Sequence, residues 1–169
     1  FLLNICLFFF FFKEKAAYRV PRRPGGLEVC IRRFASAASK TLPTTTSLAN
    51  SLAAALQAKK ALIVMVSLDG CPFCKISREH YLIPLREQQN IAIVQVNMRS
   101  REKIKDFKSA DTTHDQLIRS WGIKVAPTVL FFGQNGIELA DRLSGAYIPD
   151  FYGTYLDERI QRANSQIII

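Results

Sequence analysis

The feature that most constrains the fold of this chain is an uninterrupted apolar run rich in β-branched residues, Ala61–Ser67. The run lacks the alternating polar positions of a strand with one face in water, so it is typical of a central strand covered on both faces. The runs Ile91–Val96 and Thr128–Phe132 have the same character. The chain is therefore predicted to build an α/β domain, with helices on both faces of a central sheet.

Helical patterns separate these strands. Ser47 is placed to cap the first helix, and Pro72 and Pro149 occupy first-turn positions where proline is tolerated. The predicted helices are 47–60, 72–85 with a kink at Pro84, 113–121 and one that begins at Pro149. The last helix is expected to turn a stripe of large apolar side chains toward the core: Phe151, Tyr152, Tyr155, Leu156 and Ile160.

Two further segments complete the predicted architecture. The charged residues 97–112 have weak helical signal and are expected to form a surface loop or a short helix. The Asn-Gly step within Gln134–Gly136 predicts a turn, after which Ile137–Leu143 would return as a strand and complete a hairpin. Helix-separated strands followed by a hairpin predict a mixed sheet of four to five strands.

The positive charge of the chain is concentrated near its start. The 169 residues are 49% hydrophobic, enough to bury a core, and carry a formal charge of +9. Residues 1–60 hold 10 Lys and Arg against 2 acidic residues, whereas residues 61–169 hold 13 against 12. Because the predicted folded part is nearly neutral, its charge gives no support for binding nucleic acid.

Residues 1–46 are predicted to be a largely disordered leader or linker that precedes a domain over 47–165. Phe1–Phe12 is almost entirely apolar, but its length predicts no stable membrane span, and its basic residues follow it instead of preceding it as in a signal peptide. Alternatively, the native start lies near the basic pair Arg32-Arg33, and the upstream stretch is a mis-extended reading frame. Small residues of the kind found around export cleavage sites follow that pair. A disordered basic linker explains the composition equally well.

The strongest chemical signal is the sequence Cys71-Pro72-Phe73-Cys74, directly after the first predicted strand and at the start of a helix. The free backbone N–H groups and the positive end of the helix dipole would stabilise a thiolate on Cys71. Cys74 lies one helical turn on, where it can close a disulfide or resolve a mixed disulfide formed at Cys71. Pro72 and Phe73 make the intervening turn stiff and apolar, and Phe73 is expected at the exposed rim.

Two other uses of the cysteine pair are a structural disulfide and a zinc half-site. A bridge over so short a loop contributes little stability. Zinc takes about four ligands. The other candidate ligands are Cys6 and Cys30 in the leader, His80 on the same predicted helix, and His114, which is expected to cap its helix or face water. We therefore expect redox chemistry and no metal site.

Two segments of the chain resemble the thioredoxin superfamily. The first is Val66–Lys75, which contains the Cys-Pro-Phe-Cys sequence, and the second is Trp121–Thr128, which looks like the family's Gly-(x)-(x)-Val-x-x-Pro-Thr stretch. The resemblance covers roughly Ser47 to Asn164 and implies a thioredoxin fold. In style it is similar to bacterial periplasmic members of the superfamily.

The resemblance also implies roles for individual residues. The catalytic residues would be Cys71 and Cys74. The bond between Ala126 and Pro127 would be cis and lie beside the dithiol, with the Ala126 backbone free to pair with an extended substrate strand. The substrate-binding residues would be Pro72, Phe73, Trp121, Ala126 and Pro127. A large aromatic side chain at a helix end, such as Trp121, is more often part of the core.

Two positions depart from the family pattern. The family's cytosolic reductases carry a buried Asp six residues before the first Cys, where this chain has Met65. They also usually have Trp directly before that Cys, where this chain has Gly70. The standard general base is therefore missing, and water or Asp69 are the substitutes that the sequence offers.

The sequence thus predicts a monomeric thiol–disulfide oxidoreductase that exchanges disulfides with protein substrates and receives electrons from an upstream donor. No bound cofactor is expected, because the electrons reside in the dithiol. The alternative is a non-catalytic metal carrier or chaperone-like binding module on the same fold. The leader favours export to a bacterial periplasm, with the cytoplasm as the alternative location.

Overall fold

The computed structural model describes residues 41–145 and 149–167, so the predictions made for the first 40 residues lie outside it. The elements are α1 (Leu48–Gln57), β1 (Leu62–Ser67), α2 (Pro72–Ile76), η1 (Ser77–Leu82), α3 (Ile83–Gln89), β2 (Ile93–Asn97), β3 (Lys103–Lys105), β4 (Asp111–Thr113), α4 (His114–Ser120), β5 (Thr128–Phe132), η2 (Gln134–Gly136), β6 (Leu143–Ser144) and α5 (Pro149–Ser165). Within the described residues, no helix is long and apolar enough to cross a membrane.

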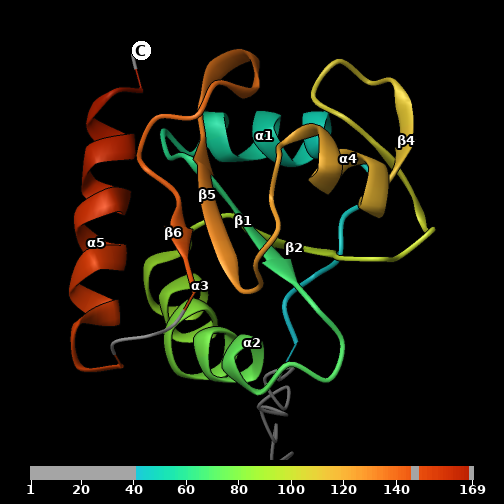
Figure 1. Cartoon of the computed structure of the whole chain (residues 1–169). Coiled ribbons are helices and arrows are strands. Elements are labelled where there is room, and N and C mark those ends of the chain that lie inside the picture. The colour runs from blue at the N-terminus through green and yellow to red at the C-terminus, as the bar shows by residue number, and fades with distance from the viewer. Residues whose placement is uncertain (1–40, 146–148, 168–169) are drawn as a thin grey trace, which may run out of the picture. The chain divides into compact units, whose positions relative to one another are not determined.

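The main sheet has four strands in the order β2-β1-β5-β6 (Figure 1). Strand β1 runs parallel to β2 and antiparallel to β5, and β5 is antiparallel to β6. The sheet is therefore mixed, as the sequence predicts. The three long apolar runs supply β2, β1 and β5, and so two of the three pairings of the sheet.

Both faces of β1 are buried, and its side chains alternate between two cores. Ile63 and Met65 point into a first core that α5 and the helix beginning at α2 cover. Leu62, Val64 and Val66 point into a second core that α1 and α4 cover. This arrangement confirms the expected helices on both faces, with α5 on one side of the sheet and α1 on the other (Figure 1).

The helix that follows the cysteines is irregular in the middle. Residues 77–82 form the π-helical segment η1 between α2 and α3, and the Ile83 N–H donates to the carbonyl of Arg78, five residues back. Pro84 comes directly afterwards and has no N–H to donate. In place of a kink at Pro84, the structure thus has a π-helical segment that ends two residues before the proline.

The prediction of a loop or short helix over 97–112 is wrong. Strands β3 and β4 form an antiparallel hairpin there, with Ile104 buried between the exposed Lys103 and Lys105. The Lys105 N–H donates to the carbonyl of Thr46 at 2.9 Å. A three-residue strand offers too short an alternation to recognise, and its pairing depends on a segment far away in the sequence.

The predicted strand over Ile137–Leu143 forms at its ends and not in its middle. Glu138 makes an isolated bridge with Phe132, and β6 contains Leu143 and Ser144 alone. Between them, the Arg142 guanidinium donates to both Glu138 carboxylate oxygens, at 2.6 and 2.8 Å. This ion pair connects the bridge residue Glu138 to the residue directly before β6.

The stripe predicted on α5 is partly wrong. Tyr152, Leu156 and Ile160 are buried at a spacing of four residues, as expected. Phe151 and Tyr155 instead lie on the exposed flank of the helix. The Tyr155 ring lies under the Arg159 guanidinium, 5.6 Å from its centroid, which gives the exposed ring a cation–π partner.

The residues directly before Ser47 already belong to the folded domain. Leu42 is buried in the first core, and Thr44 forms a parallel bridge with Gln95 of β2. The Gln95 N–H donates to the carbonyl of Pro43 at 2.9 Å. Packing therefore begins five residues before the start that the sequence predicts.

His114 is buried, so the expectation that it caps its helix or faces water is wrong. Thr113 caps α4 instead, and the Asn97 N–H donates to His114 Nδ1 at 3.1 Å. Burial lowers the pKa of His114, and the negative charge of Glu102 opposes part of that shift. The imidazole must be neutral to accept this hydrogen bond, which ties α4 to the end of β2.

We predict that the free energy of unfolding falls as the pH drops below about 6.5, the ordinary pKa of histidine. Because the pKa of His114 is lowered in the folded protein, the unfolded state binds a proton at this residue more readily than the folded state. The contribution of neutral His114 to the free energy of unfolding is therefore complete above that pH and is lost on acidification. Urea unfolding between pH 7.5 and 5 should show the fall in the wild type and a smaller one in His114→Asn. The matched control is His80→Asn, since His80 is exposed. An unchanged profile in His114→Asn would contradict the assignment.

Candidate redox site

A tight turn connects β1 to the first cysteine. The Cys71 N–H donates to the carbonyl of Leu68 at 3.2 Å, which closes the turn after the strand ends at Ser67. Gly70 has φ +74°, a left-handed conformation that side chains rarely adopt. The glycine that departs from the family pattern is therefore the residue that this turn requires.

Cys71 is the N-cap residue of α2, as expected from its place before Pro72. Its Sγ accepts a hydrogen bond from the Cys74 N–H at 3.3 Å, and its carbonyl accepts one from the Lys75 N–H at 3.2 Å. The side chain is partly exposed. A sulfur that accepts a backbone N–H at the start of a helix is held where a thiolate is stabilised and where a partner can reach it.

Cys74 faces the opposite way, into the first core, and is 1% exposed. Burial raises the pKa of its thiol, and the hydrogen bond and charge of Cys71 raise it further. The backbone of Leu68 and the side chain of Ser67 act in the other direction and lower that pKa. Met65 lies in the same core and brings no carboxylate to the second thiol. The contribution of Ser67 was not foreseen from the sequence.

The loop before β5 brings Ala126 and Pro127 to the cysteines. The peptide bond between them is cis, and the Cys71 thiol donates to the Ala126 carbonyl at 3.9 Å. Pro127 is buried, and its carbonyl accepts from the Gly145 N–H at 2.7 Å. Among the described residues, nothing accepts a hydrogen bond from the Ala126 N–H. One backbone edge is thus open beside Cys71.

Apolar side chains surround the exposed sulfur. Phe73 is 56% exposed between the two cysteines, and Pro72 is exposed beside it. Val125 is 46% exposed in the loop that carries Ala126. Large apolar side chains from two elements therefore frame Cys71. Such exposed apolar groups are typical of a surface that contacts another molecule.

Trp121 is not among the residues that the structure gathers around the dithiol. Its ring packs against Phe107 and Phe132, at centroid distances of 6.3 and 5.4 Å, on the second core. Cys71 and Ala126 pack against the first core. The sheet separates the two cores, so the structure places Trp121 in an aromatic cluster on the other face.

The part of the chain that the structure describes contains no set of side chains that could ligate a metal ion. No group of three or more His, Cys, Asp or Glu side chains gathers there in a way that could hold an ion. His80 is exposed on η1, and His114 is buried, where its Nδ1 accepts a hydrogen bond from the Asn97 N–H. Cys6 and Cys30 lie outside the described residues.

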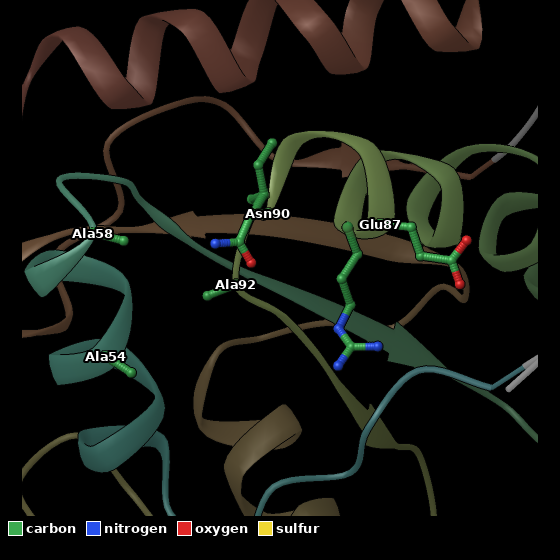
Figure 2. Close-up of a pocket in the computed structure, with 7 residues that line it drawn as sticks. Ala54, Ala58, Glu87, Asn90 and Ala92 are labelled. Atoms are coloured by element: carbon green, nitrogen blue, oxygen red, sulfur yellow. The ribbon is translucent and has the colours of Figure 1, made fainter. Parts of the chain in front are cut away.

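A shallow pocket lies at the opposite end of the sheet from the cysteines. Figure 2 shows it between the end of α1 and the start of β2, with Ala58 across from Ala92 and Asn90. Its volume is about 510 Å³, and its lining also includes Arg86 and Glu87. Its lining contains no thiol, hydroxyl or imidazole.

A family model described as a thioredoxin-like domain matches residues 48–159. The chain belongs to this thioredoxin-like family. The match starts at the first residue of α1 and ends within α5, so it includes every element of the main sheet. Membership supports the function of a thiol–disulfide oxidoreductase in general terms. No curated protein matches the sequence.

Several solved structures are similar to this chain. A thioredoxin-fold protein from Helicobacter pylori is 14% identical, with 78% of this chain and 92% of that chain covered and a TM-score of 0.50. Fasciola hepatica thioredoxin is 19% identical, with 72% and 99% covered and a TM-score of 0.47. Mitochondrial thioredoxin 3 from Saccharomyces cerevisiae, in its oxidized form, is 17% identical, with 71% and 93% covered and a TM-score of 0.46. At 14% identity, the likeness to the Helicobacter pylori protein concerns the fold alone.

We predict that alkylation distinguishes the two thiols. In a protein with Cys6 and Cys30 replaced by Ser, iodoacetamide should modify Cys71 (in Cys74→Ser) at least about tenfold faster at pH 7 than Cys74 (in Cys71→Ser). Cys74 should react more slowly because it is buried and because its pKa is raised. The thiolate is the form that reacts, and a pKa that is higher by one unit lowers the thiolate fraction about tenfold. Mass spectrometry of timed samples gives both rates. Equal rates would contradict this description of the site.

Proposed function

We propose that the protein is a thiol–disulfide oxidoreductase that exchanges disulfides with protein substrates through Cys71 and Cys74. The observation that carries the proposal is the opposite placement of the two thiols, one partly exposed at the helix start and one buried behind it. An attacking thiol must reach a partner, and a resolving thiol must be kept away from it. The two cysteines meet both requirements within a single helical turn.

The first step forms a mixed disulfide. Cys71 Sγ, as the thiolate, attacks one sulfur of the substrate disulfide, so that a bond forms from Cys71 to that sulfur and the substrate S–S bond breaks. The other substrate sulfur leaves as a thiolate and takes a proton from water. The Cys74 N–H, 3.3 Å from Cys71 Sγ, supports the anionic form of the attacking sulfur.

The second step releases the substrate. Cys74 loses its proton to water and attacks Cys71 Sγ, so that the disulfide between Cys71 and Cys74 forms and the bond to the substrate breaks. The substrate takes up a second proton and leaves as its dithiol. The protein has then given two electrons to the substrate and is left as the disulfide between Cys71 and Cys74. A thiol donor then reduces the pair, and the same steps in reverse would oxidise a substrate.

The substrate would lie as an extended segment against the loop before β5. The Ala126 N–H has no acceptor among the described residues, so it is available to a backbone carbonyl of the substrate. Phe73 and Val125 would contact apolar side chains on either side of the substrate cysteine. This mode favours disulfides in flexible, locally unfolded segments of the partner protein.

We predict that the wild type accelerates the reduction of insulin by dithiothreitol, and that Cys71→Ser lowers the rate to that of dithiothreitol alone. Turbidity of the released B chain follows the reaction. Ile137→Ala is the matched control, because Ile137 is exposed beyond the end of β5 that pairs with Leu62 at the start of β1, whereas Cys71 follows the other end of β1. Equal activity of Cys71→Ser and wild type would refute the proposed oxidoreductase activity. Zinc or copper in stoichiometric amount in the purified protein would instead favour the metal carrier.

The order of the two thiols has its own test. Cys74→Ser should accumulate a covalent complex with a disulfide-containing substrate, because Cys71 still attacks and nothing resolves the product. Cys71→Ser should accumulate none. Non-reducing electrophoresis after acid quenching measures both. A complex that forms through Cys74 and not through Cys71 would reverse the assigned roles.

We also propose that the protein acts after export, in a bacterial periplasm. The support is the basic pair Arg32-Arg33 followed by small residues, together with a domain over 47–165 whose cysteines are the pair Cys71 and Cys74. N-terminal sequencing of protein from the periplasmic fraction should find a start downstream of Arg33. Soluble protein with an intact leader in the cytosolic fraction would contradict export.

A further inference from the structure

One hydrogen bond fixes the backbone of the loop before β5, and its donor is a side chain that the proposed mechanism does not use. Thr128, the first residue of β5, is 1% exposed, and its hydroxyl donates to the carbonyl of Val125 at 2.8 Å. Threonine is branched at Cβ, so its side chain has little rotational freedom. The Val125 carbonyl is therefore held by a buried group, although the Val125 side chain is exposed.

This hydrogen bond sets the direction of the Ala126 N–H. The Val125 carbonyl and the Ala126 N–H belong to the same peptide group, which is trans and therefore planar, with its C=O and N–H bonds pointing in opposite directions. Because the carbonyl points to the Thr128 hydroxyl, the N–H points away from it. Among the described residues, no acceptor meets this N–H. The rigidity of one peptide group thus presents the Ala126 N–H to a partner.

The main sheet fixes Thr128 with respect to the attacking thiol. Thr128 lies opposite Val66 of β1 on one side and opposite Ser144 of β6 on the other. Val66 is close to the end of β1 that leads to Cys71, and the Cys71 thiol donates to the Ala126 carbonyl at 3.9 Å. The free N–H is therefore held at a defined place beside the sulfur that attacks.

We propose that Thr128 is a positioning residue: by holding the Val125 carbonyl, its hydroxyl directs the Ala126 N–H toward a backbone carbonyl of the substrate. The site thereby favours disulfides on an extended peptide over those of small molecules. This proposal rests on the proposed function. A backbone hydrogen bond beside Cys71 aligns the substrate sulfur and lowers the entropic cost of the bimolecular step. A disulfide without a peptide backbone cannot use that bond.

The chemical step is the formation of the mixed disulfide. The Cys71 thiolate forms a bond to one substrate sulfur, and the other sulfur leaves with the electron pair of the broken S–S bond and takes a proton from water. The Thr128 hydroxyl and the Ala126 N–H keep their protons throughout. Thr128 therefore changes the rate through the placement of the substrate and not through the reactivity of the Cys71 thiolate.

The test compares two substrates in a protein that stops at the mixed disulfide, the full chain with Cys6→Ser, Cys30→Ser and Cys74→Ser. One substrate is a short peptide whose cysteine carries thionitrobenzoate in disulfide linkage, and the other is mercaptoethanol with the same leaving group. Absorbance of the released thionitrobenzoate gives both second-order rate constants. Their ratio, peptide over small molecule, cancels any change in the reactivity of the Cys71 thiolate itself.

Thr128→Val keeps the shape of the side chain and removes the hydroxyl. It should lower the ratio about three- to tenfold, the effect of losing one neutral hydrogen bond. Thr128→Ser keeps a hydroxyl and should restore the ratio. The matched control is Thr112→Val, because Thr112 lies opposite Ile104 in the hairpin of β3 and β4. Ile104 belongs to the second core, whereas Cys71 packs against the first, so this control should leave the ratio unchanged.

A second measurement needs no change at Thr128. In the isolated mixed disulfide with the peptide, the Ala126 amide should exchange its hydrogen at least about tenfold more slowly than in the free protein, as ¹⁵N-edited NMR can follow. Unaltered exchange in the complex, or an unaltered ratio in folded Thr128→Val, would overturn the proposal. A protein that forms no mixed disulfide with either substrate would refute the proposed function instead.

Discussion

Burial of β1 on both faces is the constraint on which the rest of the structure depends. Its side chains alternate between two cores, so the strand cannot rotate or slip without exposing one set to water. Full burial of each such side chain is worth about 1.5–3 kcal/mol. The position of Ser67, where the strand ends, is therefore fixed, and with it the turn through Gly70 and the start of α2. Cys74, which packs into the first core, fixes that helix from the other side.

Long, unambiguous patterns could be predicted from the sequence, whereas short ones could not. The three apolar runs and the helix capped by Ser47 form where expected, because each contains enough residues to define its own periodicity. The hairpin of β3 and β4 was missed since Ile104 is its one buried side chain, held by contacts with residues near Ser47. The flank of α5 was misassigned because neighbouring helix positions differ little in a periodic pattern.

The candidate site divides in the same way. The local part, Cys71 at a helix start with Cys74 one turn on, follows from the sequence alone, since capping and spacing are properties of a few adjacent residues. The surroundings of the buried thiol do not. Tyr152 is 78 positions from Cys74 in the numbering, and only the packing of α5 on the sheet brings it into the same core. Trp121 shows the converse, because a residue close in sequence to Ala126 lies across the sheet from it.

The segment that includes Leu42, Pro43 and Thr44 protects an otherwise open border of the sheet. Strand β2 is the outermost strand on its side, and the Pro43 carbonyl and the Thr44 bridge occupy its outer edge at Gln95. An outermost strand with free backbone groups is a template on which a second chain can add. A recombinant domain that begins at Ser47 would lose this edge pairing together with the buried side chain of Leu42. We expect such a domain to self-associate through the exposed edge of β2.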